Sequence, residues 1–251
     1  MGINYREDKD LAFLEYCQEI DLKVLARYLT HDDMDRYVPH SPRFASELLE
    51  HPDFKKYDGY ADQHQRCWQL IAGELQHFGG DTFINLFRGT GVLYKEILED
   101  VCEKLKLDND EKNSIETIEN KLTEKFMSES WDKLEASQRA ELLKSVGLDP
   151  RLAGAAGLLA LQAALNAGGI ASFRISAILA NSVARLAAPT FGVVAGGSVG
   201  RSMAMLAGPI GLAIGVILTV PILSGAAYRV TILSAIQIAY MRKECYAQDR
   251  F

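Results

Sequence analysis

Two residues at helical spacing are the first candidates for metal chemistry. Glu74 and His77 are three positions apart, the Glu-x-x-His spacing with which di-iron helical bundles place two ligands on one helix face. A complete site of that kind needs a second such pair and two more carboxylates, for which Glu96 and Asp100 are candidates on the following predicted helix. Alternatively, His77 lies near the last carbonyl groups of a helix, where a cation is favoured. We favour this alternative and predict no metal site, no catalytic residue and no cofactor.

A short glycine pattern, Arg88-Gly89-Thr90-Gly91, could instead be a phosphate-binding loop. Such a loop needs a strand before it and a longer glycine pattern. Because helices are predicted on both sides, we expect a tight connection between helices. Gly79-Gly80 has a similar explanation: it is predicted to end one helix, while Asp81 caps the next.

The histidines and cysteines do not assemble into a nucleophilic site. The five histidines all lie in the first 77 residues, and no Ser/His/Asp or Cys/His set can be built from them. The four cysteines, Cys17, Cys67, Cys102 and Cys245, are far apart in the sequence. We therefore expect reduced thiols in a cytoplasmic protein. The first ten residues, MGINYREDKD, contain no apolar segment, which predicts no secretory signal.

The elements that would position these residues are helices. Over the first 149 residues, apolar side chains recur every three or four positions, the period of a helix that buries one face. No useful stretch alternates with the period of two that a half-buried strand requires. Gly147 is predicted to end the last of these helices, and Asp149-Pro150 to begin the next. The predicted helices cover 11–29 with a break near Asp21, 68–78, 83–87, 93–105, 115–126 and 131–146, and a polar connection covers 31–43.

Charge divides the chain into two unlike segments. Residues 1–149 carry 19 Lys and Arg against 31 Asp and Glu, a net charge of −12. Residues 150–251 carry eight Lys and Arg against two acids, a net charge of +6. The acidic segment offers no basic face to nucleic acid, so no nucleic-acid partner is expected. The basic segment suits an anionic membrane surface, although its cations are mostly isolated arginines.

The second segment contains long uncharged runs that two kinds of structure would explain. The runs 152–173 and 202–228 reach the roughly 20 apolar residues that span a bilayer. A helix wrapped by other helices in a protein core is also apolar all round. A buried arginine there would need a carboxylate partner, and only the first segment could supply one, since no acid lies between Pro150 and Lys243.

The end of this segment predicts a helical hairpin. Residues 207–243 are expected to form two helices that bend around Pro221 and Gly225, because proline lacks an N–H and glycine tolerates left-handed angles. Small side chains would then let the two helices approach closely. The residues predicted to act in this packing are Gly208, Pro209, Gly211, Gly215, Pro221, Gly225 and Arg229.

Three stretches resemble an uncharacterised bacterial family, the YaaW-like proteins. They are DLAFLEYCQEIDLKVLARYL (10–29), QHQRCWQLIAGELQHFGGDTFINLFRGTGVLYKEILEDVCEKLKL (63–107) and GAAYRVTILSAIQIAYMR (225–242). The resemblance implies an all-α fold without established enzyme activity, and a remote link to ubiquinol–cytochrome c chaperones. The residues that the resemblance singles out are Glu74, His77, Gly79, Gly80, Asp81, Arg88, Gly89, Gly91 and Tyr94.

These observations together predict an all-α protein in two parts. Residues 1–149 form an acidic helical domain able to fold alone, with a small module at 1–30 and a chaperone-like region at 44–149. Residues 150–251 form a glycine- and alanine-rich apolar domain with a C-terminal hairpin. We expect a non-enzymatic protein of the cytoplasm that associates with the inner membrane and binds a protein partner. The family resemblance alone implies that it assists assembly of a membrane complex. A membrane-perturbing effector and a soluble enzyme with a metal at Glu74 and His77 are the alternatives.

Overall fold

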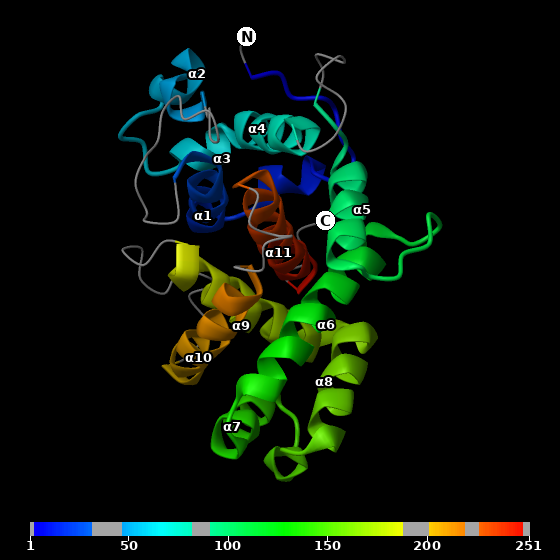
Figure 1. Cartoon of the computed structure of the whole chain (residues 1–251). Coiled ribbons are helices and arrows are strands. Elements are labelled where there is room, and N and C mark those ends of the chain that lie inside the picture. Colours follow the sequence, from blue (N-terminus) through cyan, green and yellow to red (C-terminus); the bar gives the residue numbers. More distant parts are fainter. Residues whose placement is uncertain (1–2, 32–46, 82–90, 188–200, 219–225, 248–251) are drawn as a thin grey trace.

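The computed structural model describes residues 3–31, 47–81, 91–187, 201–218 and 226–247 (Figure 1). These residues form helices joined by turns and short connections, and no strand occurs among them, which confirms the predicted all-α fold. In chain order the elements are η1 (Ala12–Tyr16), α1 (Glu19–Thr30), η2 (Leu48–Glu50), α2 (Pro52–Lys55), α3 (Gln63–Arg66), α4 (Trp68–Asp81), α5 (Tyr94–Leu105), α6 (Ile115–Lys133), α7 (Ala136–Val146), η3 (Pro150–Leu152), α8 (Ala155–Ala167), α9 (Gly169–Ala187), α10 (Arg201–Leu218) and α11 (Ala226–Ala247).

Local signals set several helix ends. The Ser114 hydroxyl accepts a hydrogen bond from the Thr117 N–H at 3.2 Å, which caps the start of α6. Gly147 ends α7 as predicted, because its φ of +88° lies in the left-handed region. The Asp149 carboxylate accepts a bond from the Arg151 N–H, so the predicted Asp-Pro start is correct, although the element is the short turn η3.

Other predicted boundaries are wrong by a few residues. The break in the first helical stretch falls at Cys17–Gln18, and Asp21 lies in the first turn of α1. α4 continues through Gly79 and Gly80 to Asp81, although each glycine costs a helix about 1 kcal/mol. Asp81 is thus the last described residue of α4. The predicted helix at 83–87 and most of the connection at 31–43 lie outside the described residues.

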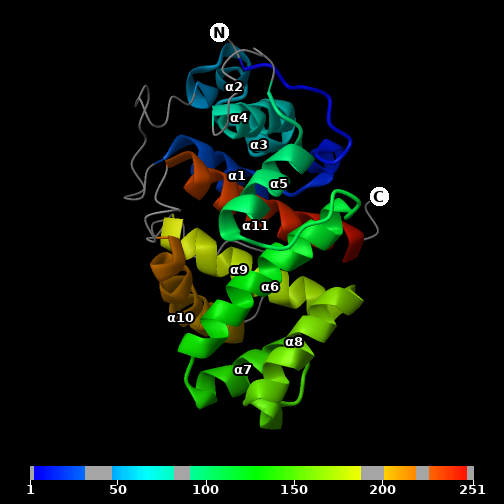
Figure 2. The ribbon, with the colours of Figure 1, turned by 45° about the vertical axis from the view of Figure 1, so that its right-hand side comes forward.

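The last helix, α11, lies at the centre of the molecule. Figures 1 and 2 show it between α1 and α4 on one side and α9 on the other. It packs against η1, α1, α4, α5, α6 and α9, and every residue from Val230 to Arg242 is buried. A helix enclosed by other helices has no solvent-exposed face, which explains why this stretch is apolar on all sides.

The two segments of unlike charge therefore share one hydrophobic core. Buried side chains of the first segment, such as Leu25, Leu75 and Phe126, belong to the same cluster as Ile236 and Tyr240 of α11. The core does not divide at Pro150, where the domain boundary was expected.

The predicted partner of α10 is wrong. α10 packs on α9 and not side by side with α11, because α11 is already surrounded by other helices. A Cβ atom added at Gly211 would lie 2.9 Å from the carbonyl oxygen of Ser182 on α9, and one at Gly215 would lie 3.3 Å from Leu186. The two glycines allow a close helix contact, but the neighbouring helix is α9.

The shared core predicts that residues 1–149 do not fold cooperatively by themselves. Without α11, the faces of α1, α4, α5 and α6 that pack on it would be exposed to water. We expect the fragment to show a broad, non-cooperative thermal transition by circular dichroism and to bind an apolar dye. Adding fragment 150–251 should restore a sharp transition. A sharp transition of fragment 1–149 alone would show that it has its own sufficient core.

Candidate functional site

A buried ion pair connects the acidic segment to the central helix. Glu119 of α6 accepts hydrogen bonds from Arg242 Nε of α11 at 3.1 and 3.2 Å. Only 1% of the Glu119 side chain and 7% of the Arg242 side chain are exposed. This is the carboxylate partner that the sequence requires of a buried arginine in the second segment.

Three further groups hold this pair in place. The Tyr94 hydroxyl of α5 donates to Glu119 Oε1 at 3.0 Å. Arg242 Nη2 donates to the carbonyl oxygen of Asp10 at 2.7 Å, and its guanidinium lies 4.3 Å from the centre of the Phe13 ring. Burial raises the pKa of Glu119, whereas the nearby Arg242 charge and these hydrogen bonds lower it. The network joins α5, α6, α11 and the N-terminal residues.

A pocket opens beside this network, between α6, the α8–α9 turn and α11. Its volume is about 480 Å³, and its wall includes Glu116, Asn120, Ser172, Arg242 and Lys243. Lys243 Nζ donates to Asn120 Oδ1 at 2.6 Å and to Ser172 Oγ at 2.8 Å. Both of these partners are neutral oxygen atoms.

In the part of the chain that the structure describes, the Lys243 ammonium has no close anionic partner. Among the described residues, no carboxylate oxygen lies within 4.0 Å of its Nζ atom. Burial lowers the pKa of Lys243 to about 8, and the more distant Glu119 and Glu116 only partly oppose this shift. The pocket therefore carries a cation whose charge the surrounding protein stabilises poorly.

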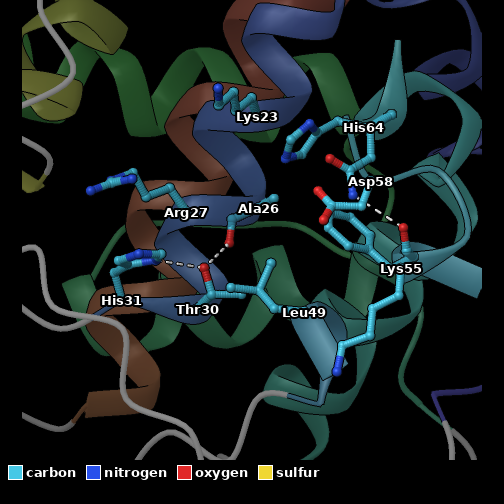
Figure 3. A pocket seen from close by; sticks show the side chains of 11 residues that line it. Lys23, Ala26, Arg27, Thr30, His31, Leu49, Lys55, Asp58 and His64 are labelled. Atoms are coloured by element: carbon cyan, nitrogen blue, oxygen red, sulfur yellow. Dashed lines mark hydrogen bonds between the residues drawn. The ribbon is translucent and has the colours of Figure 1, made fainter. Parts of the chain in front are cut away.

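A second pocket, of about 350 Å³, lies between α1 and the η2–α3 region (Figure 3). Its wall is rich in basic side chains, contributed by Lys23, Arg27, His31, Lys55 and His64. These side chains already interact with other groups of the protein: His64 bonds Glu19 at 2.6 Å, and Lys55 bonds Glu50. Burial lowers the pKa of His64. We do not assign this pocket a ligand, because its cations are occupied within the chain.

A buried acidic cluster joins α1 to α11. The Asp21 side chain is fully buried beside Glu244, and Gln18 Nε2 donates to Glu244 Oε1 at 2.9 Å. Burial, followed by the nearby Glu244 charge, raises the pKa of Asp21 well above its usual range. The Sγ atoms of Cys17 and Cys245 lie 3.6 Å apart next to this cluster, and all four cysteines are free thiols.

The structure does not bring together Glu74 and His77, the candidate ligands of the alternative metal site. Glu74 is buried, whereas His77 three residues later is exposed to solvent. In the described part of the chain, no group of three or more His, Cys, Asp or Glu residues is placed to hold a metal ion. Arg88 and Gly89 lie outside the described residues.

Two residues singled out by the family resemblance have structural roles. A Cβ atom at Gly91 would lie 2.6 Å from Gln76 Cβ, so glycine lets the start of α5 approach α4. Gln76 also fixes the N-terminal segment, because its side chain exchanges two 2.9 Å hydrogen bonds with the backbone of Arg6. Tyr94, three positions after Gly91, reaches the buried ion pair.

The residues predicted for packing near the C-terminus have different environments. Gly208 is exposed, with open space where a Cβ would lie, so no close contact requires glycine there. Pro209 lies inside α10, and Arg229 is half-buried near the start of α11. Pro221 and Gly225, the predicted bend, lie outside the described residues.

Two helices of the second segment have uncharged outward faces over the positions whose exposure the structure describes. On α8 and at the start of α9, Leu159 and Ile170 are 66% and 61% exposed, and no charged residue occurs from 152 to 173. On α10, Leu212 and Val216 are 74% and 59% exposed. Of the helices described, none by itself has the length and hydropathy to cross a bilayer, although the bent pair Ala155–Ala167 and Gly169–Leu186 does so by length and composition.

Sequence reasoning did not identify Glu119 or Lys243 as site residues. Glu119 lies among many acids on α6, and nothing in its spacing distinguishes it from Glu116 or Glu124. The available signal was indirect: Arg242 follows an uncharged run of 12 residues and needs a partner from the acidic segment.

Comparisons with known proteins find relatives along nearly the whole chain. The family described as "Domain of unknown function (DUF3944)" matches residues 5–35. The UPF0174 protein YaaW of Escherichia coli strain K12 is 38% identical over 243 residues, which cover 97% of this chain and 97% of that protein. A UPF0174 protein of Helicobacter pylori strain J99 is 31% identical over 244 residues, covering 95% of this chain and 92% of the relative. No solved structure matches.

Removing one member of the buried ion pair should strongly destabilise the fold. Arg242→Met leaves the Glu119 carboxylate buried without its cation, so we expect a loss of about 3–5 kcal/mol in the free energy of unfolding. Glu119→Leu combined with Arg242→Met removes both charges and should recover part of this loss. The measurement is urea unfolding followed by circular dichroism. The control Arg151→Met, which removes an exposed arginine paired with Asp149, should leave the midpoint unchanged. Equal midpoints for Arg242→Met and the control would contradict a structural role for the pair.

Asp21 should make the protein less stable as pH rises. Because the folded-state pKa of Asp21 is raised, the folded protein keeps a proton that the unfolded chain releases above about pH 3.9. Stability contributed by this proton is present below that pH and is lost as pH rises toward the folded-state pKa. Asp21→Asn should therefore flatten the decline in unfolding free energy between pH 4.5 and 8, measured with urea. Glu7→Gln, at an exposed position, should keep the wild-type slope; a wild-type slope in Asp21→Asn as well would refute the assignment.

Proposed function

The chain belongs to the UPF0174 family, and we propose that it is a non-enzymatic helical protein that attaches to the surface of an anionic membrane through α8 and α10. The observation that carries this proposal is the absence of charge from the outward face of α8 and from the exposed positions of α10 between 208 and 216, where side-chain exposure is described. A surface helix of a soluble protein normally presents charged or polar side chains on the face that meets water.

The α8 face is uncharged over its whole length and apolar at all but one position. Its exposed positions are Ala155, Ala156, Leu159, Ala163, Asn166 and Ala167, and the exposed Ile170 follows at the start of α9. Asn166 is the one polar side chain in this set. Apolar side chains on an exposed helix face favour insertion at the boundary between lipid headgroups and acyl chains.

The described part of α10 presents a second such face. Gly208, Leu212 and Val216 are four residues apart, so they lie in one row along the helix, and all three are exposed. Larger exposed apolar areas of this kind mark contact sites with other molecules.

Charge supports an anionic membrane as the contacting surface. The segment 150–251, which contains both helices, has a net charge of +6, whereas the remainder of the chain has −12. Anionic lipids attract basic segments and repel acidic ones. The segment that carries the apolar faces would thus be the one drawn to the bilayer.

The contact proposed here is superficial and does not involve α11. That helix is enclosed by six other elements and contributes its apolar side chains to the core. An assembly or chaperone role for a membrane complex stays a prediction, since none of the relatives above carries such a name.

The test is sedimentation with vesicles of phosphatidylglycerol and phosphatidylcholine. Wild-type protein should sediment with the anionic vesicles and much less with pure phosphatidylcholine. Burying a leucine side chain is worth about 1.5–3 kcal/mol, so Leu159→Asn combined with Leu212→Asn should weaken partitioning by roughly tenfold or more. The control Ile20→Asn changes an exposed isoleucine of the acidic segment and should bind as the wild type does. If the wild-type protein ignores anionic vesicles, or the double variant binds equally well, the proposal is wrong.

A further inference from the structure

We propose that the pocket between α6, the α8–α9 turn and α11 binds an anionic group, a phosphate or a carboxylate, against Lys243. This inference concerns a site different from the apolar faces and does not depend on membrane attachment.

The charges around the pocket leave Lys243 as its one uncompensated cation among the described lining residues. Arg242 also reaches the wall, but Glu119 neutralises it at 3.1 Å. The remaining carboxylate of the wall, Glu116, is exposed to solvent and accepts a hydrogen bond from the Tyr246 hydroxyl at 2.6 Å. Water screens its charge, so it opposes a bound anion weakly.

The Lys243 ammonium is fixed in position before any ligand arrives. Asn120 and Ser172 accept two of its three N–H bonds, and Ser172 donates its own hydroxyl to the carbonyl oxygen of Leu165 at 2.8 Å. An ammonium has three donors, so one N–H remains for a ligand. A cation held by neutral oxygens loses little conformational freedom when an anion binds.

The start of α9 adds to the preference for negative charge. Gly168, Gly169 and Ile170 line the same pocket, and α9 begins at Gly169. The first N–H groups of a helix have no partner within the helix and form the positive end of its dipole. A phosphate or carboxylate oxygen in the pocket would meet both the lysine and this helix end.

The titration of Lys243 agrees with this assignment. Burial lowers the pKa of Lys243 to about 8, because the surrounding protein disfavours the ammonium form. An anion close to Nζ would stabilise that form and raise the pKa again. By linkage, a ligand that raises this pKa binds more tightly when the lysine is charged.

Two sources could supply this anionic group. Ile170 lines the pocket and is also 61% exposed at the end of the apolar α8 face. The headgroup of an anionic lipid could therefore reach the pocket from a membrane, and a small soluble phosphate or carboxylate could reach it from water. The chemistry of recognition is the same in both cases.

The first test measures thermal unfolding of the full chain with inorganic phosphate, against sodium chloride at the same ionic strength. Phosphate should raise the midpoint of the wild-type protein and of Lys112→Met, a control at an exposed lysine. Lys243→Met should weaken the apparent phosphate affinity by about tenfold or more, which corresponds to one lost charge-assisted bond. Equal phosphate effects on both variants would place the anion elsewhere and overturn the assignment.

A second measurement needs no substitution, so it holds even if Lys243→Met fails to fold. A lysine with a pKa near 8 should be acylated faster at pH 7.5 than ordinary surface lysines, and the modified peptide can be quantified by mass spectrometry. Protection of Lys243 by phosphate or acetate supports a soluble ligand, and protection by phosphatidylglycerol vesicles but not phosphatidylcholine vesicles supports a headgroup. Unchanged acylation with all of these probes contradicts the site.

The Leu159→Asn and Leu212→Asn double variant should keep its phosphate response, so loss of membrane attachment would leave this inference intact.

Discussion

The buried pair of Glu119 and Arg242 constrains the rest of the structure. An arginine cannot be removed from water without an anion and further acceptors, and α11 contains no acid before Arg242. α6 must therefore lie beside the end of α11, and Tyr94 brings α5 to the same point. The Asp10 carbonyl and the Phe13 ring complete the surroundings of the guanidinium. One charge thus determines where four distant parts of the chain meet.

The same constraint explains the uneven distribution of charge. The acidic segment supplies the carboxylates, and the second segment supplies the central helix and the arginine that needs one of them. The charge difference that suggested two separate domains is therefore compatible with one shared core. Lys243, the next residue, bonds neutral oxygen atoms and no carboxylate. The charge of Arg242 is therefore neutralised within the described part of the chain, whereas the charge of Lys243 is not.

Sequence periodicity correctly predicted the position and the buried residues of helices that have one buried face. Ile97, Val101 and Leu105 recur every four residues, and all three are buried on α5. Periodicity could not predict the packing of α11, because a helix that is apolar on every side does not show which face contacts which neighbour. A helix buried in lipid and a helix buried in protein also have the same apolar sequence pattern. The site was less predictable still: Glu119 and Lys243 are 124 positions apart in the sequence, and their proximity follows from tertiary packing alone. Tyr94 was identified through the family resemblance and not through its chemistry.

The place of α11 after the other described helices in chain order has a consequence for protein synthesis. Ribosomes produce the N-terminal residues first, at about 5–20 residues per second. The helices that surround α11 are therefore made before the helix they enclose, and roughly 5–20 s separate residue 149 from the end of α11 at Ala247. During that interval the nascent protein exposes the apolar surfaces that α11 later covers, and any product of premature termination keeps them exposed permanently. Quality control by cellular chaperones and proteases would thus recognise chains in which α11 has not yet been made.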